Sequence, residues 1–142
     1  MSLEFFNSLS GTLNITLSEP PEDISPNLSN QRATPTAEIA ELTLAVQVWE
    51  GNADFRAPTS EELTQPALSQ PEVTLRGLGD PITHQAPNGQ WFTVDDLLTA
   101  VTETERATRH QQPWFDGIDV HHIFFEGIEF GENGIGEINW GS

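Results

Sequence analysis

The chain of 142 residues contains no cysteine, no lysine and no tyrosine, and each absence removes a class of chemistry. Without cysteine there is no thiolate nucleophile and no cysteine-ligated zinc site. Without lysine there is no Schiff base and no Walker A phosphate loop. Without tyrosine there is no phenolic acid or base. An enzyme built from this sequence would have to use carboxylates, histidine or a bound metal.

The sequence also lacks long apolar runs, since no stretch reaches the roughly 18 apolar residues that suggest a membrane-spanning helix. The N-terminus has no basic segment followed by an apolar one, so we expect no signal peptide and a cytoplasmic protein. The length predicts a single domain over residues 1–142. Residues 19–36 are rich in proline, serine and asparagine and predict an irregular loop.

Positive charge is scarce, because 22 acidic residues face only five arginines and the formal net charge is −17. Such a surface repels phosphate groups, so we expect no binding to nucleic acid or to anionic membranes. It attracts basic proteins and divalent cations over long distances. The same charge is typical of a surface that only maintains solubility and of a salt-adapted protein. The sequence leaves these interpretations and the oligomeric state open.

Alternating apolar and polar residues predict several strands. The predicted strands cover residues 11–18, 41–51 and 71–78, and a further hairpin turns at Asn88-Gly89 within residues 81–92. A short helix is expected with Ser60 as its N-cap and Pro66 as its stop. The order of these elements predicts an α+β fold with an antiparallel sheet of about five to seven strands.

One main helix is predicted at about residues 93–110, packed on one face of the sheet. Thr93 is expected to cap it, with Asp96 at the acidic position of a capping box. Glu105 continues the apolar stripe of this helix, and a carboxylate facing a core needs a partner. Arg109, four residues later, is placed to supply one.

The last predicted element is a hairpin within residues 124–140, for which two registers compete. A three-residue loop ending at Gly134 matches both the turn chemistry and the apolar pattern better than a two-residue turn. It places Ile128 opposite Ile138, Phe130 opposite Gly136 and Glu126 opposite Trp140. The core face then carries His122, Phe124 and Glu126, and the other face sets Glu129 against Glu137 with Glu132 nearby.

Three functional hypotheses follow, and the first requires least of the sequence. In the first, an acidic, non-catalytic protein binds a basic protein, as an inhibitor or accessory protein does. This hypothesis is based on the net charge and on residues 116–142, which contain six acids and no arginine. The candidate partner-binding residues are Asp116, Glu129, Glu132 and Glu137. Trp49, Trp91 or Trp114 clustered on the surface would mark a recognition patch.

The second hypothesis is a weak site for calcium or another divalent cation. Its ligands would be Glu129, Glu132 and Glu137, with Asp119 and His121, and His84 as a further donor for the latter two. Calcium prefers six to eight oxygen ligands, which is more than the hairpin offers. The simpler interpretation of the opposed glutamates is a solvated rim.

The third hypothesis is a small enzyme or ligand pocket that uses Glu105, His122 and Glu126. A histidine and a carboxylate in an apolar setting have shifted pKa values and can exchange protons with a substrate. The simpler interpretation is that Glu126 is in water and His122 bonds to the backbone.

Overall fold

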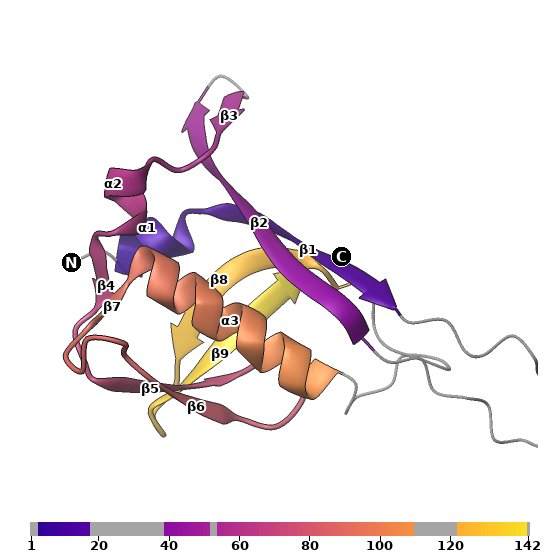
Figure 1. Cartoon of the computed structure of the whole chain (residues 1–142), viewed down its shortest axis with the longest axis vertical. Helices are drawn as coiled ribbons and strands as arrows, with labels where there is room; N and C mark the ends of the chain where they lie inside the picture. Colours follow the sequence, from indigo (N-terminus) through magenta and orange to yellow (C-terminus); the bar gives the residue numbers. More distant parts are fainter. Residues whose placement is uncertain (1–2, 18–38, 52–53, 110–121, 142) are drawn as a thin grey trace, which may run out of the picture.

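The computed structural model describes residues 3–17, 39–51, 54–109 and 122–141. Within these ranges the chain forms a seven-stranded sheet, a separate pair of short strands and three helices (Figure 1). The predicted mixed fold with a large, mostly antiparallel sheet is confirmed. The irregular loop predicted at 19–36 lies outside the described residues.

The large sheet has the order β3-β2-β1-β8-β9-β5-β6, and the small one pairs β4 with β7. All neighbours in the large sheet are antiparallel except β5 and β9, which are parallel and were not predicted to pair. The strands are β1 (Ser10–Leu17), β2 (Ile39–Gly51), β3 (Asp54–Arg56), β4 (Pro66–Leu68), β5 (Glu72–Arg76), β6 (Ile82–Gln85), β7 (Phe92–Thr93), β8 (Phe124–Phe130) and β9 (Ile135–Gly141).

The hairpin predicted within residues 81–92 is wrong. The chain does turn at Gly89, which has φ of 77° and whose N–H donates to Ala86 O. However, β6 pairs with β5, whereas β7 pairs with β4. The strand after the turn is short because Thr93 ends it as the cap of the next helix.

The helices are α1 (Leu3–Asn7), α2 (Ser60–Leu63) and α3 (Val94–Thr108). The capping box of α3 is present as predicted, because Thr93 and Asp96 bond reciprocally at 3.0 Å. Helix α2 has its own capping box, with Thr59 rather than Ser60 as the cap. None of the helices in the described ranges is long and apolar enough to cross a bilayer.

The closing hairpin has the predicted register near its turn. Ile128 pairs with Ile138, Glu129 with Glu137 and Phe130 with Gly136. Gly134 has φ of 81°, and Gly131 N–H bonds Ile135 O across the loop. The predicted three-residue loop is therefore confirmed.

Farther from the turn the predicted pairing is wrong, because β8 contains a bulge between Phe125 and Ile128. Trp140 pairs with Phe125 instead of Glu126. Gly127, with φ of 100°, makes the irregular conformation accessible. The bulge reverses the inward and outward faces, so Phe125 is buried while Phe124 and Glu126 are exposed.

One cluster of buried apolar side chains joins α1, α3 and strands from both sheets. Its largest fully buried members include Phe6, Phe92, Leu75 and Leu97. Phe125 lies between two other aromatic rings, with centroid distances of 5.4 Å to Phe6 and 5.7 Å to Trp140. The bulge therefore places Phe125, not Phe124, where the core needs an aromatic side chain.

Candidate interaction surface

Every arginine in the described ranges forms an ion pair with a glutamate of the same chain. These pairs are Arg56 with Glu50 and Glu62, Arg76 with Glu137, Arg106 with Glu103, and Arg109 with Glu105. The exposed acids that have no arginine partner within the same ranges are Glu4, Glu41, Asp54, Glu61, Glu72, Asp95, Glu126, Glu129 and Glu132. The internal pairs thus use the available positive charge and leave much of the negative charge on the surface.

The pair between Arg56 and Glu62 shows how strongly one arginine is held. Arg56 Nη1 and Nη2 each donate to Glu62 at 2.8 Å, and Glu50 accepts from the same guanidinium. Hydrogen bonds from Arg56, and then from Thr59 N–H, lower the pKa of Glu62 to about 2. This carboxylate is therefore ionised at any pH near neutrality.

At the closing hairpin the opposed glutamates differ in environment. Glu137 binds Arg76, which the parallel pairing of β5 with β9 places directly beside it. Glu129 and Glu132 are exposed. Arg76 therefore relieves the repulsion that the hairpin sequence alone predicted between Glu129 and Glu137.

The predicted metal ligands are only partly within the described structure. Among the residues that it covers, no group of three or more histidine, aspartate or glutamate side chains could hold a metal ion. Asp116, Asp119 and His121 lie outside those residues, so their roles stay predictions. His84 lies on β6, where its Nε2 is 2.7 Å from Thr104 Oγ1.

The predicted partner of Glu105 is confirmed, in a setting more buried than expected. Glu105 and Arg109 are both fully buried, and Arg109 Nε donates to Glu105 Oε1 at 2.7 Å. Trp140 Nε1 donates to Glu105 Oε2 at 3.0 Å, and the Arg109 guanidinium lies 5.1 Å from the Trp140 ring centroid. Gly77 is so close that a Cβ there would overlap the Glu105 carboxylate.

The three residues of the hypothetical catalytic pocket have different environments. The Glu105 carboxylate is fully buried and is bound by Arg109 and Trp140. Glu126 is exposed at the bulge. His122 is half-buried, and its main-chain oxygen accepts from Arg109 Nη2 at 2.8 Å. This arrangement fits a structural ion pair that anchors the end of α3 to β9 and to the segment just before β8.

A small cavity of about 130 Å³ lies between β6 and α3 and is lined in part by His84, Phe92, Asp96 and Glu103. Thr104 donates its only hydroxyl proton to Ala100 O, so it accepts from the Nε2–H of His84. Burial lowers the pKa of His84, while the charge of Glu103 opposes this effect. The neutral, Nε2-protonated histidine is therefore the form that fits the structure.

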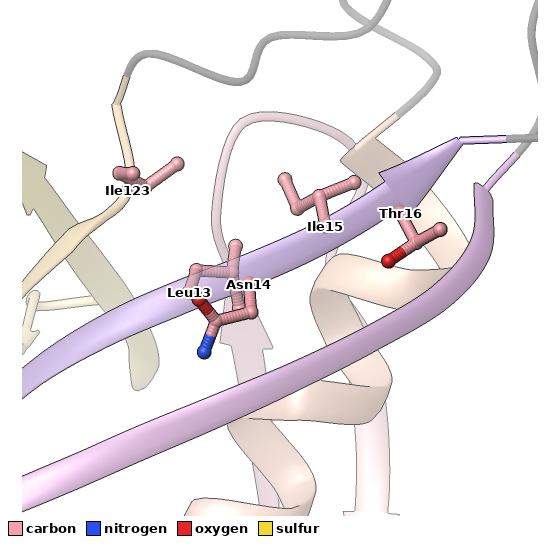
Figure 2. Close-up of a pocket in the computed structure, with 5 residues that line it drawn as sticks. All are labelled: Leu13, Asn14, Ile15, Thr16 and Ile123. Atoms are coloured by element: carbon pink, nitrogen blue, oxygen red, sulfur yellow. The ribbon is translucent and has the colours of Figure 1, made fainter.

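Another hollow, of about 360 Å³, lies where β8 leaves β1 (Figure 2). Leu13 N–H bonds Ile123 O at 2.8 Å, at the point where the two strands separate. The lining residues are Leu13, Asn14, Ile15, Thr16 and Ile123. None of these five described side chains is charged.

Two aromatic side chains share a surface on β2 and β3. Trp49 and Phe55 are directly opposite each other in the strand register, and they are 59% and 48% exposed. β3 and the end of β2 that pairs with it extend away from the rest of the molecule at the upper end of Figure 1. Trp49 was predicted as a candidate recognition residue, whereas Phe55 was not. Gly51, which lies between these two aromatic residues in the sequence, is typical of a hairpin turn and could have indicated the pair. Trp91 is 38% exposed, and Trp114 is outside the described residues.

A groove of about 310 Å³ lies between β2 and α3, which run side by side in Figure 1. It is lined by Leu42, Thr43, Leu44, Asp95, Leu98, Thr99, Thr102, Glu103 and Arg106. Arg106 Nη2 reaches across it and donates to Leu42 O at 2.9 Å. The groove therefore has a strand on one side and a partly acidic helix surface on the other.

Comparison with known proteins gives no relative from which a role could be transferred, because no family model, curated protein or solved structure matches this chain.

Proposed function

We propose that this chain is a non-catalytic protein that binds a basic protein partner through its acidic surface. The observation that carries the proposal is the pairing of each described arginine with a glutamate of the chain itself. Because these cations are already engaged, the remaining exposed carboxylates are free to act on another molecule. A surface of this kind raises the association rate of cationic partners.

The exposed pair of Trp49 and Phe55 supports the same proposal. Aromatic residues are enriched among those that contribute most to protein–protein binding. Their faces also attract lysine and arginine side chains. Asp54, an exposed acid without an arginine partner in the described ranges, precedes Phe55 in the sequence, so an apolar contact and negative charge are available at one place.

The proposal also includes the finer features expected from the sequence. It takes the chain as one domain, with α3 packed on one face of the sheet, in a cytoplasmic protein. Glu129 and Glu132 at the closing hairpin contribute to the binding surface, and Asp116 is assigned to it from the sequence. Among the described residues, no observation favours the cation-binding or enzymatic alternatives.

Calorimetry with two capped peptides tests the proposal. One alternates glycine with lysine, and the other alternates glycine with glutamate. We expect the full chain to bind the lysine peptide and not the glutamate peptide. Equal binding of both peptides, or binding of neither, would contradict the proposal.

Two variants then locate the binding surface. Glu129→Gln combined with Glu132→Gln should weaken binding of the lysine peptide by removing local charge. Trp49→Ala should weaken it roughly threefold, the loss expected for an exposed cation–π contact. Trp91→Ala is the matched control, because Trp91 is also exposed but precedes β7 and is not part of a described strand pair. An equal loss of affinity in both tryptophan variants would show that the pair of Trp49 and Phe55 is not part of the binding surface.

A further inference from the structure

The edge of β2 that faces α3 is only partly covered by another strand. β3 pairs with β2 from Val48 to Gly51. From Ile39 to Gln47, no strand in the described ranges pairs with β2 on the side away from β1. β3 stops here because Pro58 follows Arg56 by two residues and lacks the N–H that a strand pairing requires.

The main-chain groups of β2 that point to this edge can be identified from the hydrogen bonds. Leu13 N–H points to Ile123 in the neighbouring chain segment, so its partner Leu44 directs its own N–H and C=O away from β1. Leu42 O points the same way, since it accepts from Arg106. Alternation along the strand adds Val46. Arg106 donates to Leu42 O. On this edge, the main-chain groups of Leu44 and Val46 form no hydrogen bond with another described segment.

The groove beside this edge is lined by acidic side chains that could bind a basic segment. Asp95 and Glu103 lie on the α3 side. Asp95 has no arginine partner in the described ranges, whereas Glu103 pairs with Arg106 through Oε2 and, as a carboxylate, can accept from a second cation. Leu98, only 8% exposed, lies between them along the helix. The eight-residue step from Asp95 to Glu103 spans about 12 Å along a helix. Side chains four residues apart on one face of a strand are separated by about 13 Å.

We propose that the β2 edge binds an extended segment of the basic partner by strand addition. The main-chain N–H and C=O groups of this segment form hydrogen bonds with those of Leu44 and Val46. Two basic side chains, four residues apart, face Asp95 and Glu103. A small apolar side chain between them contacts Leu98. This inference rests on the proposed function and adds the place and sequence pattern of recognition.

The probe is a capped heptapeptide, Thr-Lys-Thr-Val-Thr-Lys-Thr, titrated into the ¹⁵N-labelled full chain. The control is Thr-Thr-Lys-Lys-Val-Thr-Thr, which has the same composition but places its lysines on opposite faces of a strand. We expect the probe to bind about tenfold more tightly than the control. It should also shift the amide signals of Leu44 and Val46 and slow their hydrogen exchange. Methylating alternate main-chain nitrogens of the probe should abolish the difference.

A matched pair of protein variants tests the charge assignment. Asp95→Asn should weaken probe binding, whereas Glu61→Gln, which removes one exposed charge from α2, should change it much less. Suppose that both peptides bind equally and in a salt-sensitive way, and that hydrogen exchange of the Leu44 and Val46 amides is not slowed. This result would contradict strand addition at the β2 edge and leave the proposed function intact. Failure of every lysine-containing peptide to bind would overturn both the proposed function and strand addition at the β2 edge.

Discussion

Glu105 is the only fully buried acidic residue among those that the structure describes. Its carboxylate is fully buried, and Arg109 and Trp140 occupy both of its oxygens. A buried ion pair contributes little net stability compared with apolar residues, but losing one partner is costly because the other remains charged. The arrangement is therefore structural, and it explains why an acid continues the apolar stripe of α3.

Glu105→Ala should lower the free energy of unfolding by about 3–5 kcal/mol. The double variant Glu105→Leu with Arg109→Met should recover most of that loss, because no charge remains buried. Urea unfolding of the three proteins measures both effects. A loss of less than about 1 kcal/mol for Glu105→Ala, typical of an exposed pair, would contradict the account.

His84 should make stability depend on pH. Burial lowers its folded-state pKa below the unfolded value, so the unfolded chain binds the proton more readily. Its contribution to stability is complete above about pH 6.5 and is lost as the pH falls through the lower, folded-state pKa. His84→Gln keeps a donor for Thr104 and should show a weaker dependence between about pH 7.5 and about pH 5. Identical pH profiles of unfolding for the two proteins would argue against this assignment.

The bulge in β8 is held by a side chain from the other end of the sequence. Asn7 Nδ2 donates to Ile128 O at 3.0 Å, and Asn7 Oδ1 accepts from Ile128 N at 2.9 Å. Gly131 N–H bonds Ile135 O, so by the alternation of an antiparallel pair Ile128 directs its N–H and C=O away from β9. The Asn7 amide thus takes the place of a strand partner on the other edge of β8, next to the bulge. The contact also explains the small residue at Gly127, because a Cβ there would lie 3.1 Å from the Asn7 side chain.

Asn7→Ala should lower the free energy of unfolding by about 1–3 kcal/mol, because two main-chain groups of Ile128 lose their partner. Asn7→Asp should also destabilise the protein, since a carboxylate cannot donate to Ile128 O. Asn139→Ala, at an exposed position of β9, is the control and should stay within about 0.5 kcal/mol of the native chain. Thermal or urea unfolding gives the free-energy change for all three variants. An Asn7→Ala effect as small as that of the control would contradict the role of Asn7 in holding the bulge.

Local chemistry made the turn at Gly134, the capping box at Thr93 and the pair of Glu105 with Arg109 predictable from the sequence. Each involves residues within a few positions of one another. The bulge in β8 was not predictable in this way, because it depends on Asn7. The same limit applies to the site: β5 brings Arg76 to Glu137 through a parallel pairing that no local pattern indicates.

The charge of the chain concerns association, not the fold. A net charge of −17 alone does not distinguish a binding protein from a merely soluble one. What the structure adds is the distribution: the described arginines are paired internally, and the exposed Trp49 and Phe55 lie beside acidic residues. An uncovered strand edge beside α3 then offers a place for an extended segment.

The most direct test of the central claim is the affinity of the full chain for the glycine–lysine peptide as a function of salt. Charges on an exposed surface are screened within about 10 Å at 0.1 M salt and within about 3 Å at 1 M. We therefore expect the affinity to fall by at least about tenfold from low to high salt. An affinity that is the same at both salt concentrations would contradict a function based on uncompensated surface charge.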